Sequence, residues 1–361
     1  MIACSASHAP ETGAPTYFTA CLVSVENLEL EIEFPHRIDP VRREIIWVRT
    51  TTHCLREALF LDGRSVFWVG EPRSQSFGSF LTGTPDIAHP ERNIFHMAFC
   101  GSTLIARILE ASDAAVVLKE PQILVDLADW RKALVRQGLT DPDFEPILRA
   151  ARHTLASIGN GGAPVVVKPS NWANNLLADL SAGPDKMRPL FITIAAEPFL
   201  HAVFRGGRDR IVFTARAADH MAYAFANGRE LIAGAVLAST DPLQQVAHLA
   251  ALLHRMQSEL FRSAQARVDW SGRIIDFSEI TNQPAAAAGR AAEILDLEIP
   301  SQSLTRAASA VAASNAKQPD TPYLPADREI ENRAVLDEHR DRIEKALAFA
   351  ANVRPDPIGV M

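Results

Sequence analysis

The stretch that decides the fold is residues 94–110, "IFHMAFCGSTLIARILE". The apolar run at 94–99 predicts a buried strand, and the apolar spacing over 103–111 predicts a helix. The first N–H groups of a helix have no partner within it, and the helix dipole adds partial positive charge there. A strand, a tight turn and a helix in this order therefore predict an anion-binding loop.

The small residues of the turn supply what such a loop needs. Gly101 allows close approach of the backbone, while Ser102 and Thr103 carry hydroxyl donors. The loop contains no lysine or arginine, and the Walker A pattern G-x-x-x-x-G-K-[ST] is absent. An ordinary Ser/Thr N-cap that closes a strand–helix turn is the alternative, and this stretch alone favours neither interpretation.

The composition of the chain limits the class of protein. It has 361 residues, 47% of them hydrophobic and 22% charged, which is typical of a soluble globular protein. The net charge of −7, without a long basic run, argues against a general nucleic-acid binder. No apolar run approaches the roughly 20 residues of a membrane span, and no signal peptide is expected at the start.

The cysteines and histidines give no metal-site pattern. Cys4, Cys21, Cys54 and Cys100 form no CxxC pair, so we expect free thiols in a reducing cytoplasm. The sequence also lacks H-E-x-x-H, and no metal is expected.

Residues 1–92 predict an accessory region that is mostly β. After a frayed start, strand-like runs occur at 17–25, 28–34, 43–50 and 65–70. Residues 71–93 are rich in Gly, Pro and Ser and predict a linker or surface loop.

Residues 93–300 predict an α/β domain with a central parallel sheet flanked by helices, because short apolar runs alternate with helical periods. The expected strands are 94–99, 115–119, 164–168, 189–195 and 273–277. The expected helices are 103–111, 121–137, 143–158, 171–181, 198–205, a long segment within 216–266, and 284–296. Residues 301–361 predict a polar tail and a charged outer helix.

Four segments resemble the sulfotransferase family in the family's order. "FCGSTLIARIL" (99–109) resembles the loop that holds the 5′-phosphosulfate, and "VVVKPSNWANNLLADL" (165–180) resembles the strand ending in Lys-x-Pro with its helix. "PLFITIAAEPFLHAVFRGG" (189–207) is similar to the strand that carries the 3′-phosphate signature. "GRIIDFSEITNQPAAAAGRAAEILDLEIP" (272–300) is similar to the late strand and the helix after it.

The resemblance implies a P-loop sulfotransferase fold and 3′-phosphoadenosine 5′-phosphosulfate as sulfuryl donor. It implies that the donor is held by the loop residues Cys100, Gly101, Ser102 and Thr103. The acceptor would carry a hydroxyl or an amine, and its identity is left open.

Two charged residues are the candidates for catalysis. Glu120 falls where several sulfotransferases have their general base, and a carboxylate there could accept the acceptor's proton. Lys168 follows an apolar strand and is expected at the carboxyl edge of the sheet, where α/β proteins bind ligands. The alternatives are a helix-start glutamate and a strand-end lysine that reaches solvent. Lys119 is a second candidate cation at such a strand end.

The sequence also departs from the family pattern. Phe99 stands where a basic residue precedes the loop, Cys100 replaces the loop serine, and Ala196 replaces the arginine for the 3′-phosphate. Phe204 replaces the later serine of that signature. Arg205 and its neighbours Arg208 and Arg210 are candidates to replace the missing cations; the alternative is a solvated basic turn.

These departures leave three functions open. The first is sulfuryl transfer, favoured by the positions of Glu120 and Lys168. The second is a non-catalytic nucleotide- or anion-binding protein on this fold, and the third is a transferase with another phosphorylated donor.

Overall fold

The structure is a computed structural model of the whole chain. It describes residues 31–84, 90–158, 163–181, 187–268, 270–312, 314–315, 318–322 and 325–359. The frayed start, the run at 17–25, Cys4 and Cys21 therefore lie outside the described residues. None of the helices searched, all within these ranges, is long and apolar enough to cross a membrane.

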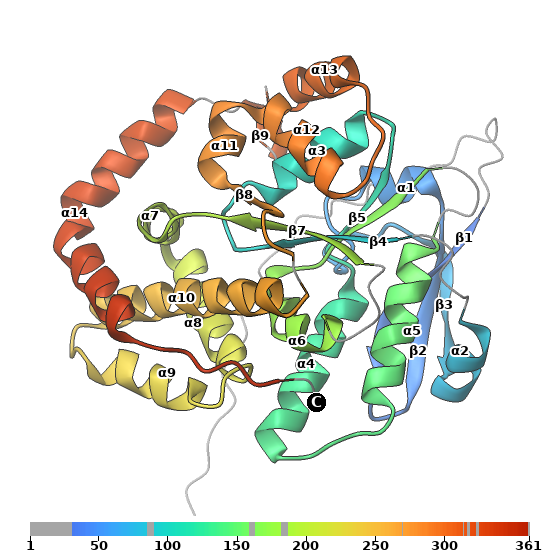
Figure 1. Cartoon of the computed structure of the whole chain (residues 1–361), viewed down its shortest axis with the longest axis horizontal. Helices are drawn as coiled ribbons and strands as arrows, with labels where there is room; N and C mark the ends of the chain where they lie inside the picture. The colour runs from blue at the N-terminus through green and yellow to red at the C-terminus, as the bar shows by residue number, and fades with distance from the viewer. Residues whose placement is uncertain are drawn as a thin grey trace, which may run out of the picture.

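A five-stranded parallel sheet forms the centre of the molecule (Figure 1), which confirms the α/β class and all five expected strands. Its order is β5-β6-β4-β7-β8. The chain therefore begins with the central strand β4, adds β5 and β6 on one side of it, and then adds β7 and β8 on the other side. The strands are β4 (Glu91–His96), β5 (Val116–Lys119), β6 (Val165–Lys168), β7 (Met187–Thr193) and β8 (Ile274–Asp276). Their apolar side chains are buried because helices cover both faces of the sheet.

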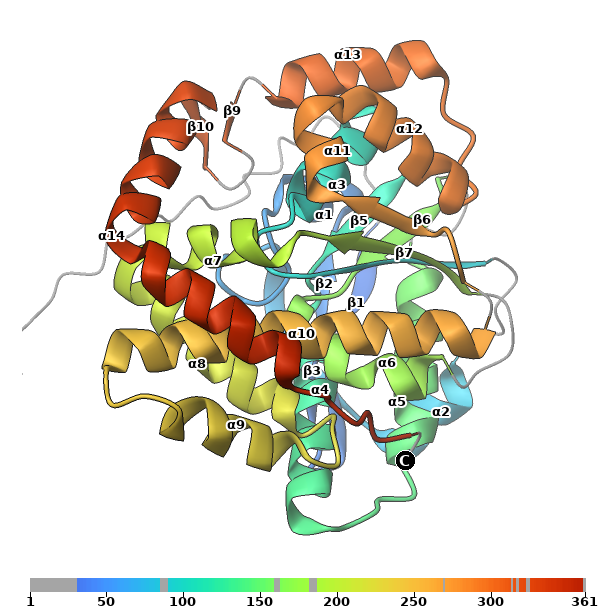
Figure 2. The same cartoon turned by 60° about the vertical axis from the view of Figure 1, so that its left-hand side comes forward.

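Helices α3, α11, α12 and α13 lie on one face of the sheet, and α4, α5, α6 and α10 lie on the other (Figures 1 and 2). The first face holds α3 (Ser102–Ala111), α11 (Phe277–Asn282), α12 (Pro284–Ile294) and α13 (Ser301–Ala312). The second face holds α4 (Gln122–Gln137), α5 (Phe144–Ala156), α6 (Leu177–Leu180) and α10 (Pro242–Val268). The remaining helices of this part are η1 (Asn171–Leu176, a 3-10 helix), α7 (Ala196–Arg205), α8 (Gly207–Ala222) and α9 (Gly228–Leu237). The expected helix at 171–181 is thus a 3-10 turn followed by a short α-helix, and the long segment within 216–266 contains three helices.

The N-terminal region forms an antiparallel sheet of order β1-β2-β3, which confirms its β character. The elements are β1 (Ile32–Asp39), β2 (Glu44–Thr50), α1 (Thr52–Glu57), β3 (Val69–Ser76) and α2 (Phe77–Gly83). The expected linker at 71–93 is wrong in its described part: it holds most of β3, all of α2 and the start of β4. The Gly and Ser residues of this segment indicate a loop, but Phe77 and Phe80 are buried and hold α2 against the core.

The small sheet and the central sheet share one hydrophobic core. Phe34 and Ile45 from the small sheet and Ile94 from the central sheet are fully buried in the same cluster. Strand β1 packs on α4 and α5, and α5 also packs on β4 and β6 of the central sheet. The accessory region is therefore continuous with the α/β part.

The C-terminal part follows the core as an outer layer. It contains β9 (Ser314–Asn315), β10 (Gln318–Pro322) and α14 (Pro325–Asn352). Figure 2 shows α14 crossing over α10, and Ile343 and Ala346 on its inner side are buried. The expected charged outer helix is confirmed, with one apolar side facing the molecule.

Candidate functional site

The predicted loop, residues 97–101, lies at the carboxyl end of β4, between the ends of β6 and β7. This is the point where the strand order reverses, and α/β sheets bind ligands at such points. Two residues of the loop have left-handed backbone, Phe99 with φ 63° and Gly101 with φ 80°. A non-glycine residue in this region is uncommon and costs conformational energy, so the surrounding packing must impose this shape on the loop.

Gly101 is required here for two reasons. Its positive φ disfavours any residue with a Cβ, and α11 leaves little space for one. A Cβ at this position would lie 3.3 Å from Cγ2 of Ile280 and 3.4 Å from Cδ2 of Phe277. The side chains of Ser102 and Thr103, which begin α3, are buried next to it. The loop is thus held tightly, with two hydroxyl side chains in the first turn of α3.

Cys100 is a buried thiol at the base of the loop. Burial raises its pKa to about 11, while hydrogen bonding from Ser102 and the charge of Lys168 act in the opposite direction. The thiol is therefore neutral at physiological pH and is no nucleophile. Lys168 ends β6, the neighbour of β4 in the parallel sheet, so it lies at the same edge as the loop.

Phe99, which stands where a basic residue was expected, packs against the helices after β7. Its ring lies 5.7 Å from that of Phe199 and 6.2 Å from that of Phe213. The guanidinium of Arg210 lies over the Phe99 ring at 4.9 Å. Arg210 of α8 thus contacts the loop through the Phe99 ring, while its Nη1 donates to the Ala202 carbonyl oxygen at 2.7 Å.

Lys168 and Glu120 meet at the carboxyl edge of the sheet. The Lys168 Nζ atom donates to Oε1 of Glu120 at 2.7 Å. The lysine side chain is 1% exposed and the glutamate side chain 14%, so the pair opens to solvent only on the glutamate side. Glu120 has φ 58°, and its backbone N–H donates to the Lys168 carbonyl oxygen at 2.7 Å. The structure thus brings together the two residues predicted to be catalytic.

Lys119 has different partners. It lies beside Lys168 in the parallel register of β5 and β6, yet its Nζ donates to the Arg56 carbonyl oxygen and to Oε2 of Glu110, both at 2.7 Å. Burial lowers the pKa of Lys119 and raises the pKa of Glu110, and their mutual attraction opposes both changes. Lys119 therefore joins α1 and α3 to the sheet edge and is held away from donor binding.

Arg205, the other predicted donor-binding cation, lies at the far end of α7 from β7. Its guanidinium donates to Oδ1 of Asn332 and lies 3.5 Å from Oε2 of Glu331. Both partners belong to α14, so Arg205 connects α7 to the outer helix and is not brought to the loop.

The N-terminal region contributes a residue that the sequence did not predict. Arg64 donates from Nε to Oδ2 of Asp62 at 2.6 Å, and its Nη2 lies 3.5 Å from Oε2 of Glu120. The same guanidinium lies 3.9 Å from the centre of the Phe60 ring. "LDGR" (61–64) reads as a turn, and no local signal places it beside residue 120.

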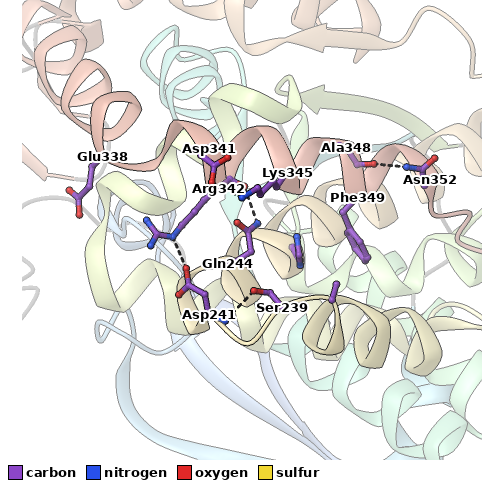
Figure 3. A pocket seen from close by; sticks show the side chains of 12 residues that line it. Ser239, Asp241, Gln244, Glu338, Asp341, Arg342, Lys345, Ala348, Phe349 and Asn352 are labelled. Carbon is purple, nitrogen blue, oxygen red and sulfur yellow. Dashed lines mark hydrogen bonds and ion pairs between the residues drawn. The ribbon is translucent and has the colours of Figure 1, made fainter.

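A well-defined cavity lies away from this loop. It is a groove of about 670 Å³ between α10 and α14, lined by both acidic and basic residues (Figure 3). Arg342 crosses it to Asp241 at 2.9 Å, and the His248 ring stacks on Phe349. None of its lining residues comes from the loop or from the ends of β5 and β6. We place the candidate site at the loop, because buried charges and strained backbone meet there.

Within the described ranges, no group of three or more His, Cys, Asp or Glu side chains could hold a metal ion. Comparison of the sequence with known protein families gives no match, and no curated protein sequence matches it either.

Proposed function

We propose that this protein is a sulfotransferase-like enzyme that moves a sulfuryl group from 3′-phosphoadenosine 5′-phosphosulfate to a hydroxyl or amine acceptor. The observation that carries the proposal is the Lys168–Glu120 pair, which joins a cation and a carboxylate from two strands beside the β4 loop. The position of this loop at the reversal of strand order also supports it.

The residues suit the charges that such a reaction moves. The acceptor oxygen forms a bond to sulfur while the bond between sulfur and the 5′-phosphate oxygen breaks. Glu120 would take the acceptor's proton on its solvent-facing side. Lys168, the first turn of α3 and the hydroxyls of Ser102 and Thr103 would stabilise the negative charge on the departing phosphate. This assignment uses no metal.

Nucleotide binding can be tested with two matched lysines. We expect 3′-phosphoadenosine 5′-phosphate to raise the unfolding temperature of the wild type, because a ligand at 100 times its dissociation constant adds about 2.7 kcal/mol. Lys168→Met should abolish the rise. Lys119→Met removes an equally buried lysine with its own glutamate partner and should leave the rise intact. Loss in both variants, or in neither, would contradict the role given to Lys168.

One observation favours a different donor as the second candidate. Arg205 is bound to α14 and Ala196 has no charge, so the usual partners of a 3′-phosphate are missing. A transferase with another phosphorylated donor would need no such partners. ATP and GTP in the same unfolding experiment distinguish the two, because a rise with either alone favours this candidate. A rise with the bisphosphate but no turnover favours a non-catalytic nucleotide-binding protein.

A further inference from the structure

The loop of residues 60–64 in the N-terminal region is fixed directly against the Glu120 turn. The Leu61 N–H donates to the Lys119 carbonyl oxygen at 2.7 Å, and the Gln122 N–H donates to the Leu61 carbonyl oxygen at 3.1 Å. Leu61 itself is fully buried. These two bonds flank Glu120 on both sides, so the position of the loop relative to this carboxylate is set by the backbone.

Arg64 is the outermost charged group at this point. Its side chain is 59% exposed, whereas Asp62 is 17% and Glu120 is 14% exposed. A molecule that arrives from solvent therefore meets the guanidinium before either carboxylate. The face of the guanidinium rests on the Phe60 ring, which holds it in a defined plane.

The contacts of Arg64 leave part of its hydrogen-bonding capacity open. Oδ2 of Asp62 lies 2.6 Å from both Nε and Nη2. The 3.5 Å separation of Nη2 from Glu120 is long for a charge-assisted bond, which is typically about 2.7–2.9 Å. Among the described residues, none accepts from Nη1. A guanidinium with a free edge beside the candidate base suits a planar or tetrahedral anion.

We propose that Arg64 determines acceptor specificity by binding an anionic group, a carboxylate or a phosphate, of a hydroxyl acceptor. This inference rests on the proposed function, because it assigns the acceptor side of the same site. The negative charge of Glu120 repels an anionic acceptor, and Arg64 offsets this repulsion. Because Arg64 and Glu120 are adjacent, the anion and the hydroxyl must be close neighbours in the acceptor, as in a small hydroxy acid or hydroxyalkyl phosphate.

The test uses matched pairs of probes that differ in charge. Lactate is compared with lactamide, and glycerol 3-phosphate with glycerol, by following the Nε–Hε NMR signal of Arg64 in the full-length protein. The signal is assigned by its disappearance in Arg64→Lys. We expect at least one anion to shift it saturably and both neutral partners to leave it unchanged. The two pairs distinguish a carboxylate from a phosphate.

The control is Arg42→Gln, because Arg42 is another exposed arginine of the region that is paired with a nearby aspartate. The affinity for the anion that shifts the Arg64 signal is measured by calorimetry. Arg64→Gln should lower this affinity about tenfold or more, the usual effect of losing a charged hydrogen bond. Arg42→Gln should leave it unchanged. No shift with either anion, equal shifts with a neutral partner, or equal affinity in Arg64→Gln would each overturn the proposal. The probes bind without a nucleotide. Failure of the anions to bind at Arg64 is therefore distinguished from failure of the protein to bind 3′-phosphoadenosine 5′-phosphate.

Discussion

Two buried lysine–glutamate pairs lie side by side at the ends of β5 and β6. Lys119 with Glu110 and Lys168 with Glu120 have the same 2.7 Å contact, and both lysines are almost fully buried. The two glutamates are also similarly exposed, 12% for Glu110 and 14% for Glu120. The first pair contacts α1 and α3, whereas the second lies at the end of β6, beside the strand that carries the β4 loop. The two pairs thus have the same contact distance in different surroundings. On the proposed function, the first pair is structural and the second takes part in the chemistry.

The largest difference between the pairs should appear in turnover. We expect Glu120→Gln to lower the release of 3′-phosphoadenosine 5′-phosphate from the sulfuryl donor about 100-fold or more, because the amide cannot accept the acceptor's proton. Glu110→Gln, the same change in the other pair, should leave turnover nearly unchanged. The measurement is release of this product with a panel of hydroxyl and amine acceptors. Turnover of Glu120→Gln within a few-fold of wild type would refute the role of Glu120 as base.

The second difference should appear in the free energy of unfolding. Here the change in the Lys119–Glu110 pair should have the larger effect. Lys119→Met leaves Glu110 buried without its main partner, a loss that typically costs about 3–5 kcal/mol. Lys168→Met should cost less, because Glu120 keeps a second cation nearby, the Arg64 Nη2 atom at 3.5 Å from its Oε2. Urea unfolding of both variants measures the two free energies. An equal or larger loss in Lys168→Met would show that the second pair is also a main structural element.

The smallest effect is the pH dependence of the Lys119–Glu110 pair. Burial raises the pKa of Glu110, so between its ordinary value of 4.5 and its folded value the native state binds more protons, and the free energy of unfolding falls as pH rises. Burial lowers the pKa of Lys119, so between its folded value and 10.5 the unfolded state binds more protons, and the free energy of unfolding rises with pH.

The check is urea unfolding across pH for the wild type and a Glu110→Gln/Lys119→Met double variant. The difference between the two curves should slope down in the acidic window and up in the alkaline one. A flat difference across both windows would mean that the pair titrates as it does in the unfolded chain.

The sheet and the position of the loop could be predicted because their signals are local. The apolar runs around residues 94, 165 and 190 each bury a strand, and parallel strands place their carboxyl ends at one edge. The sequence therefore predicts Lys168 and Glu120 at the same edge of the sheet, and the structure adds the direct contact between them.

The remaining candidates could not be assigned in this way, because their partners are distant in sequence. Whether Lys119 turns to the loop or away depends on Glu110 and on the Arg56 carbonyl oxygen. Arg205 donates a hydrogen bond to Asn332, which lies 127 residues later. Arg64 reaches the site only because Leu61 pairs with the β5 end, and no periodicity in the sequence reports such a pairing.

The backbone bonds of Leu61 have a consequence for self-association. Strand β5 is the outermost strand of the parallel sheet, and an uncovered outer strand offers its N–H and C=O groups to other chains. The backbone of Leu61 forms hydrogen bonds with the Lys119 carbonyl oxygen and the Gln122 N–H near the end of this strand. Helix α1 packs alongside β5. The N-terminal region thus shields the sheet from strand addition, and a chain shortened to begin at β4 would expose an edge prone to aggregate.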